Sequence, residues 1–187
     1  MSLKKNLAIE ENKKLFFFDE SRFGTHSKVG HGWFEKGKRT GVKVQLGFQN
    51  FYIYSAVNPI SGDSFTLKLP YVDTVCMNVF LEEMSKEIGE SEAVVVMDGA
   101  GWHKSKNLIV PKNIIIKLLP PYCPELNPVE RLWLYIKQNT IRNKIYESIR
   151  HIKLSNATYM IYNDELLWSK ACHNIYKNQK EYKYKHY

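Results

Sequence analysis

Two short stretches of sequence decide the fold: Leu15-Phe16-Phe17-Phe18-Asp19 and Ala93-Val94-Val95-Val96-Met97-Asp98. Each is a continuous apolar run that ends in an aspartate, and such runs are typical of strands buried on both faces of a sheet. A third run, at residues 113–119, predicts another buried strand. Open α/β sheets bind ligands at the carboxyl ends of parallel strands. We therefore expect Asp19 and Asp98 to emerge at one rim if their strands are adjacent and parallel.

Weaker patterns predict the elements between these runs. Alternating apolar residues at 43–57 and at 64–69 predict two strands joined by a turn at 58–63. Asp73 is placed to cap a helix that Gly89 would end. Strands in a meander, followed by alternating helices and strands, predict an α/β domain with a mixed sheet flanked by helices.

A proline-rich segment at residues 120–128 is incompatible with a helix or a central strand. It leads into a predicted helix with Asn127 as its N-cap and Pro128 in its first turn. Residues 141–187 read as a basic, helical extension. The whole chain, 1–187, is therefore predicted to be one domain with a C-terminal extension.

Composition limits the class of protein. The chain has 187 residues, of which 44% are apolar, and this supports one domain with a substantial core. No apolar run reaches the length of a membrane span, and the polar first residues are no signal peptide. The three cysteines are far apart and form no C-x-x-C pair, which argues against a disulfide framework and a cysteine-based zinc site. We expect a cytoplasmic protein without a membrane partner.

The net charge of +8 is concentrated at one end of the chain. Residues 1–130 carry 16 basic and 15 acidic side chains, whereas residues 131–187 carry 11 and 4, so the balances are +1 and +7. A basic region favours a polyanionic partner, nucleic acid first, because bound phosphates release counterions. A solvated surface is an equally good reading of charge alone.

Three acids suggest a metal site. Asp19 and Asp98 on strands and Glu130 on the predicted helix could together hold two magnesium ions, which favour a few carboxylates and leave positions for water and phosphate. Each acid also has a structural reading. Asp19 could be an ordinary strand-end carboxylate, Asp98-Gly99 is a common turn signal, and Glu130 could complete a capping box with Asn127.

Three motif blocks resemble those of the DDE transposases of the mariner-like superfamily, especially bacterial insertion-sequence members. The blocks are Phe18-Asp19-Glu20-Ser21, Met97-Asp98-Gly99-Ala100-Gly101-Trp102-His103 and Leu118-Leu119-Pro120-Pro121-Tyr122-Cys123-Pro124-Glu125-Leu126-Asn127-Pro128-Val129-Glu130-Arg131-Leu132-Trp133. The resemblance covers about residues 14–140. It implies a ribonuclease H-like fold and Mg²⁺- or Mn²⁺-dependent DNA cleavage and strand transfer at transposon ends.

The resemblance also assigns roles to residues. Asp19, Asp98 and Glu130 match the acidic triad as catalytic residues and metal ligands. His103 stands where relatives often carry a histidine, and it would either orient a phosphate or metal-bound water or serve only to start a helix. Relatives carry an N-terminal helix-turn-helix region, for which no room exists before Asp19, so we expect a catalytic domain alone. A homodimer on DNA is the expected assembly, associated with the nucleoid.

Candidate phosphate contacts lie in the glycine-rich stretch and the basic extension: Lys36, Lys38, Arg39, Lys144, Arg150 and Lys153. The glycine-rich stretch contains no G-x-x-x-x-G-K-[ST] motif, so no nucleotide cofactor is expected. Two alternatives to a transposase remain at this point. One is a ribonuclease H-like nuclease or resolvase, and the other is an inactive, DNA-binding remnant of a transposase.

Overall fold

The computed structural model describes residues 9–10, 12–25, 35–37, 41, 47–121, 123–138 and 148. Within these residues five strands form one mixed sheet: β1 (Lys14–Gly24), β2 (Asn50–Val57), β3 (Ser64–Leu69), β4 (Ala93–Met97) and β5 (Ile114–Leu118). The strand order is β3-β2-β1-β4-β5. The first three strands form the predicted antiparallel meander, and the last two extend the sheet as parallel strands.

Strand β1 is the centre of the sheet, because it pairs antiparallel with β2 and parallel with β4. The parallel register places Phe17 opposite Val96. Two residues further along, the same register would set Asp19 opposite Asp98. The expectation that the two apolar runs form adjacent, parallel strands is confirmed.

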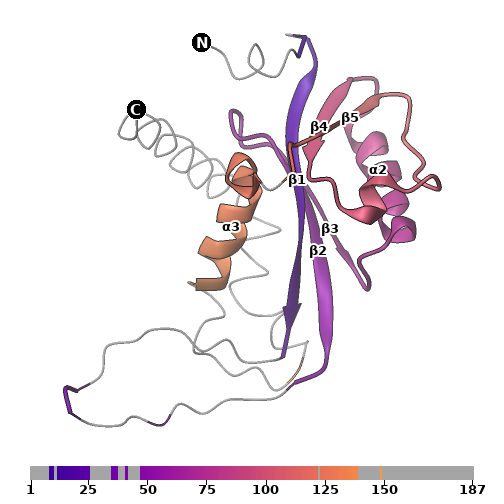
Figure 1. Cartoon of the computed structure of the whole chain (residues 1–187). Helices are drawn as coiled ribbons and strands as arrows, with labels where there is room; N and C mark the ends of the chain where they lie inside the picture. Colours follow the sequence, from indigo (N-terminus) through magenta and orange to yellow (C-terminus); the bar gives the residue numbers. More distant parts are fainter. Residues whose placement is uncertain are drawn as a thin grey trace.

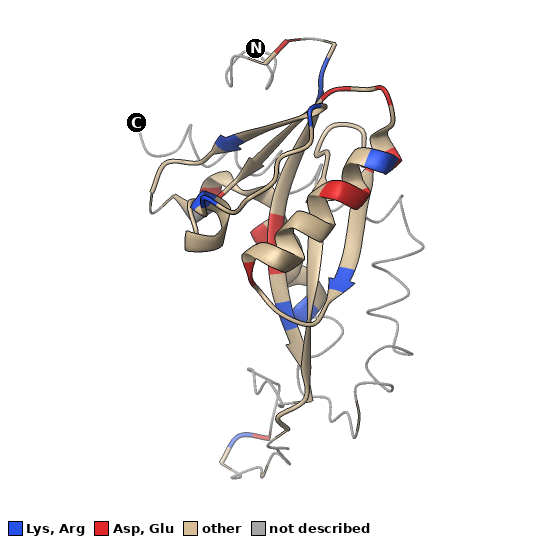
Figure 2. Ribbon diagram, turned by 90° about the vertical axis from the view of Figure 1, so that its right-hand side faces the viewer, with Lys and Arg blue, Asp and Glu red and all other residues tan. Residues whose placement is uncertain are grey.

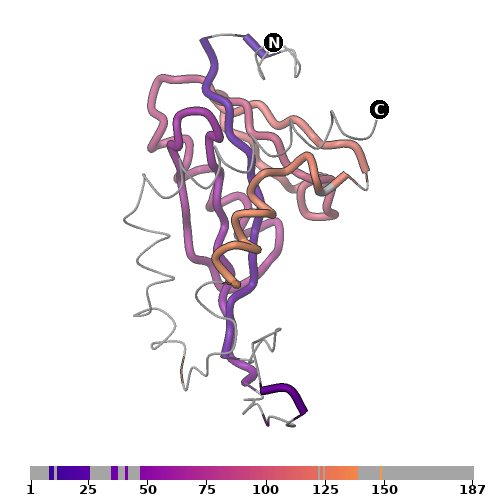
Figure 3. Tube along the Cα trace, turned by 90° about the vertical axis from the view of Figure 1, so that its left-hand side faces the viewer, coloured from indigo at the N-terminus to yellow at the C-terminus, as the bar shows by residue number. Residues whose placement is uncertain are grey.

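A helix covers each face of the sheet. Helix α2 (Thr74–Ile88) packs on one face and α3 (Pro128–Ile136) on the other, as the edge-on view of the sheet shows (Figure 1). Figure 3 shows the orange tube of α3 crossing in front of the central strands. Side chains alternate along β1, so Phe16 and Phe18 join the core under α2 while Leu15 and Phe17 join the core under α3.

Local signals at the helix ends have the structural effect that the sequence predicts. Asp73 Oδ1 accepts a hydrogen bond from the Cys76 backbone nitrogen at 2.8 Å, and Gly89 ends α2 with a φ of +59°. Asn127 caps α3 and Pro128 occupies its first turn. An N-cap side chain satisfies a backbone N–H that has no partner inside the helix, and the positive φ suits a residue without a Cβ.

Three predictions about strands are wrong. Strand β1 does not end at Asp19 but continues to Gly24, because the residues beyond Asp19 keep the alternation and pair with β2. Strand β5 is not buried throughout: it lies at the edge of the sheet, and only Ile114 among its residues is buried. Strand β2 begins at Asn50, and residues 47–49 are not strand.

The predicted helical extension at 141–187 lies outside the described residues, apart from Ser148. Over the residues that the structure describes, no helix combines the length and apolar character needed to cross a membrane. A mixed sheet with a helix on each face confirms the predicted fold class.

Candidate active site

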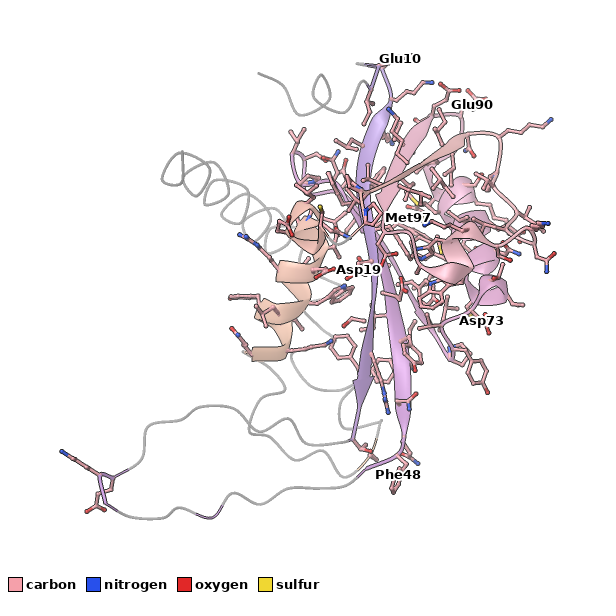
Figure 4. All side chains as sticks on the ribbon, in the orientation of Figure 1. Glu10, Asp19, Phe48, Asp73, Glu90 and Met97 are labelled. Atoms are coloured by element: carbon pink, nitrogen blue, oxygen red, sulfur yellow. The ribbon has the colours of Figure 1, made fainter. Side chains whose placement is uncertain are left out.

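Three acidic side chains come from three different elements near the middle of the sheet. Asp19 lies within β1, on the strand face that α3 covers, and Figure 4 labels it between β1 and α3. Asp98 directly follows β4, the parallel neighbour of β1. Glu130 stands in the first turn of α3. The fold therefore gathers acids that are 32 to 111 positions apart in sequence.

A buried asparagine fixes the start of α3 against the central strand. Asn127 is 2% exposed, and its Nδ2 donates to the Phe18 carbonyl oxygen at 2.8 Å. Its Oδ1 accepts from the Val129 backbone nitrogen at 3.2 Å, which caps the helix. One side chain thus ties the helix that carries Glu130 to the residue that precedes Asp19. The sequence identifies Asn127 only as a cap, because nothing local signals the contact with Phe18.

The pKa values of two of the acids, Asp19 and Glu130, are raised. Burial raises the pKa of Asp19 to about 8, and the negative charges of Glu20, Glu130 and Asp98 add to this effect. Burial also raises the pKa of Glu130, with contributions from Asp98 and Glu125. Close carboxylates oppose each other's ionisation. A cation that neutralises these carboxylates would therefore stabilise the folded protein.

A cleft of about 480 Å³ lies beside these acids. It is lined by residues from the end of β4, the proline-rich segment and the start of α3, including Asp98, Cys123, Asn127 and Glu130. Figure 2, which colours acidic ribbon red, shows acidic positions in the middle of the sheet as well as on the outer helix α2. The cleft gives Asp98 and Glu130 access to a ligand.

One basic residue, Lys104, also lines the cleft. Its side chain lies over Gly99, since a Cβ built at Gly99 would come within 2.5 Å of Lys104 Nζ. The absence of a side chain at Gly99 therefore leaves room for the Lys104 ammonium group, next to the residue that follows Asp98 in sequence. No local sequence pattern marks Lys104, because its place in the cleft depends on the backbone path of the short helix η1 (Gly101–Lys104).

His103 contacts Asp98 from the other side. The residue is 4% exposed, and Nδ1 lies 2.7 Å from Asp98 Oδ1. Burial lowers the pKa of His103, but the nearby carboxylates of Glu20 and Asp98 outweigh that effect and raise it. The imidazole is thus buried against the acidic group and does not project into the cleft as a surface side chain.

The candidate ligands have donor atoms that suit a hard divalent cation, but their side chains do not enclose a position for one. Among the described residues, no three His, Cys, Asp or Glu side chains stand close enough to enclose a metal ion. Carboxylate oxygens are nevertheless the donors that Mg²⁺ and Mn²⁺ take in proteins. Burial, followed by the nearby negative charges, raises the pKa of half-buried Asp19, and a cation would stabilise its ionised form. The chemistry of these carboxylates therefore fits a divalent cation.

The predicted phosphate contacts are mostly outside the described residues. Lys36 is described and lies in an exposed turn at 35–37, drawn as a short coloured piece away from the sheet in Figure 1. The structure does not bring it to the acids. The other candidates fall on residues that the structure does not describe: Lys38, Arg39, Lys144, Arg150 and Lys153.

Comparison with known proteins gives a family and a fold. Residues 14–153 match the family model described as "DDE superfamily endonuclease". A protein of Sinorhizobium fredii (strain NBRC 101917 / NGR234), described as uncharacterized protein y4pE/y4sA, is 42% identical over 97 residues. That match covers 51% of this chain and 72% of the relative.

Solved structures with a similar fold include complexes of the Mos1 transposase. The Mos1 strand transfer complex has a TM-score of 0.69 at 13% identity, and the match covers 95% of this chain and 56% of that one. The paired-end complex with the left transposon end has a TM-score of 0.67 at 13% identity, with 92% and 55% covered. Two further Mos1 paired-end complexes, with Mn and with Mg, have TM-scores of 0.62 and 0.61. The chain spans a little over half the length of these solved chains.

Proposed function

Because the chain belongs to the DDE superfamily of endonucleases, we propose that it carries the catalytic site of a transposase, which cleaves DNA strands at transposon ends and joins them to target DNA. One observation carries the proposal: Asp98 and Glu130 line one cleft, and their negative charges add to the effect of burial that raises the pKa of Asp19 in the central strand. The likeness of the fold to the Mos1 strand transfer complex supports it.

The three carboxylates are the proposed holders of divalent cations. Asp19 supplies oxygens from the rigid centre of the sheet, Asp98 from the end of the next strand and Glu130 from α3. Two bound Mg²⁺ or Mn²⁺ ions would activate an attacking oxygen and stabilise the charge on the departing one. Mos1 complexes with Mn and with Mg support the choice of these ions.

The chain's own residues position the DNA. Lys104 is placed to contact a backbone phosphate at the cleft, and Asn127 keeps Glu130 in register with Asp19. In the proposed cleavage, a water oxygen forms a bond to phosphorus while the bond to the 3′-oxygen breaks and that oxygen takes up a proton. In the transfer step, the oxygen of the freed 3′-hydroxyl loses its proton and forms a bond to a phosphorus of the target strand. The bond from that phosphorus to the target 3′-oxygen breaks, and this oxygen takes up a proton. No covalent bond to the protein forms, so the protein contributes placement and charge.

The assembly follows from this chemistry. Strand transfer joins two transposon ends, and a homodimer on DNA would bring two such sites together. The excess of basic residues in 131–187, with a balance of +7, supports binding of the DNA backbone outside the cleft.

A nicking assay on supercoiled plasmid, with Mn²⁺ or Mg²⁺ present, tests the function. We expect Asp98→Asn to reduce nicking on the order of 100-fold or more, because it removes the charge of one proposed ligand. Asp63→Asn is the matched control, since it removes an identical charge from an exposed position in the turn between β2 and β3. Equal activity of wild type and Asp98→Asn would refute the proposed chemistry.

The same assay separates the alternatives. Cleavage of an RNA–DNA hybrid with no nicking or joining of duplex DNA would favour a ribonuclease H-like nuclease. DNA binding without metal-dependent nicking would favour an inactive remnant. Joined products in a strand-transfer assay with a precut end would support the transposase.

A further inference from the structure

A buried histidine bridges two carboxylates behind the cleft. His103 Nδ1 lies 2.7 Å from Asp98 Oδ1 and 3.1 Å from the Asp98 carbonyl oxygen. Its other ring nitrogen, Nε2, faces Glu20 Oε2 at 3.6 Å. The side chains of His103 and Glu20 are 1% and 10% exposed. The three residues form a chain that runs from the cleft into the core under α2.

The contacts define what each atom can do. A carboxylate oxygen and a carbonyl oxygen only accept hydrogen bonds, so His103 Nδ1 must carry the proton it shares with Asp98. Asp98 Oδ1 also accepts from the Ala100 backbone nitrogen at 3.1 Å. Two donors therefore hold one oxygen of Asp98. The other oxygen is the one that remains for a ligand in the cleft.

Glu20 has its own anchor. Its Oε1 accepts a hydrogen bond from Trp102 Nε1 at 3.0 Å. It follows Asp19 on β1, so the pleat of the strand sends it to the opposite face, under α2. The other oxygen, Oε2, faces His103 Nε2 at the ion-pair distance of 3.6 Å, and neither of these two buried atoms has a hydrogen-bond partner. A buried polar atom without a hydrogen-bond partner lowers the stability of the fold. Its presence here indicates that Glu20 and His103 have a role beyond packing.

We propose that Glu20 is a positioning residue that acts through His103 to aim the Asp98 carboxylate at the cation site. This inference rests on the proposed function. The Glu20 carboxylate fixes the ring, the ring fixes one oxygen of Asp98, and the second oxygen is left in the orientation that binds the cation. Partners of this kind behind a metal ligand commonly change metal affinity about 10- to 100-fold when they are removed.

Four variants of the full chain test whether Glu20 acts on Asp98 through His103. Glu20→Ala removes the anchor, and Glu20→Gln keeps an acceptor for Trp102 while it removes the charge. His103→Asn keeps a donor near the position of Nδ1 but cannot reach Glu20. The double variant joins Glu20→Ala to His103→Asn. Ser85→Ala is the control for a lost hydrogen bond, since Ser85 Oγ bonds Asn113 at 2.6 Å at a distance from the acids.

The measurement is the Mn²⁺ concentration that half-saturates the protein, read from the electron paramagnetic resonance signal of free Mn²⁺. We expect Glu20→Ala to raise this concentration about tenfold and Glu20→Gln to raise it in the same direction. In the His103→Asn background, Glu20→Ala should add little, because the residue through which it acts is already gone. Ser85→Ala should leave the concentration unchanged. If Glu20→Ala does not fold, Glu20→Gln carries the test.

Each outcome decides the matter. An unchanged Mn²⁺ concentration in the Glu20 variants, or an equal shift in both backgrounds, would overturn the inference. A wild type that binds Mn²⁺ and shows the shifts, yet does not nick DNA, would support the inference and refute the proposed function. A wild type that binds no Mn²⁺ would refute both.

Discussion

The substitution Asp19→Asn is expected to stabilise the protein when no metal is bound. Asp19 is a half-buried carboxyl group in the central strand. Burial and the negative charges of its acidic neighbours Glu20, Glu130 and Asp98 destabilise its ionised form. The asparagine side chain has nearly the same shape and no charge. It should therefore remove the repulsion and preserve the packing, at the cost of a proposed metal ligand.

The size and pH range of the effect follow from the shift in pKa. Folding raises the pKa of Asp19 from 3.8 to about 8. The folded state is therefore penalised when the group ionises, so stability falls as the pH rises from 3.8 to about 8 and then stays low. The shift corresponds to a ceiling of about 6 kcal/mol. Because water reaches the half-buried side chain, we expect about 1–3 kcal/mol to remain.

Thermal unfolding between pH 5 and pH 9 measures the effect. For a chain of 187 residues, each 1 kcal/mol corresponds to about 2–4 °C, so Asp19→Asn should unfold about 2–12 °C above wild type at pH 8.5 without metal. The difference in unfolding temperature between the variant and wild type should become smaller toward pH 5. Added Mn²⁺ should raise the unfolding temperature of wild type and leave the variant unchanged. Asp63→Asn serves as the control for the loss of an exposed charge.

Two results would refute this reasoning. One is a variant that unfolds below wild type at pH 8.5 without metal, which would mean that the Asp19 charge stabilises the fold. The other is a gap between the two proteins that stays constant from pH 5 to pH 9. A constant gap would assign the effect to packing or hydrogen bonding, because neither depends on the ionisation of Asp19.

Three further predictions concern the surroundings of the cleft. Asn127→Ala should lower stability by about 2–4 kcal/mol and also reduce nicking, because it removes the cap of α3 and a buried hydrogen bond to Phe18. The control is Asp73→Ala, which removes the cap of α2. It should lower stability by about 1 kcal/mol and leave nicking unchanged. Lys104→Gln should weaken DNA binding and reduce its salt dependence by about one counterion, as measured by fluorescence anisotropy. Gly99→Ala should also weaken DNA binding, because the added methyl group would displace the Lys104 side chain. Glu130→Gln should reduce nicking on the order of 100-fold or more while unfolding stays cooperative; wild-type rates in that variant would exclude Glu130 from the site.

Local patterns were sufficient for much of the fold. The apolar runs predicted β1 and β4, and capping residues such as Asp73 and Asn127 predicted where helices begin. These signals work because they depend on neighbours within a few positions. The parallel pairing of β1 with β4 could be stated only as a condition, since it depends on a crossover of more than 60 residues.

The finer features of the site depend on contacts between distant segments. The Asn127–Phe18 hydrogen bond joins residues 109 positions apart, and Trp102 reaches Glu20 across 82 positions. Nothing in the residues around each partner signals such a bond. The same limit explains the error at Asp19, because pairing with β2 continues the strand beyond a residue that reads locally as its end.

The alternation of β1 explains how the chain tolerates its own acidic site. Phe18 is fully buried, and Phe17 and Phe16 are nearly so. Burial of an aromatic side chain of this kind contributes roughly 2–3 kcal/mol, which is comparable to the penalty expected for Asp19. A strand with one apolar core on each face can therefore hold a carboxylate in an unfavourable position without unfolding. That rigidity is also what a metal site needs, because the ligand oxygens must stay in place when the repulsion between them would push them apart. The destabilising charges and the double core of the sheet are thus two parts of one arrangement, in which folding free energy holds the proposed metal ligands in place despite their repulsion.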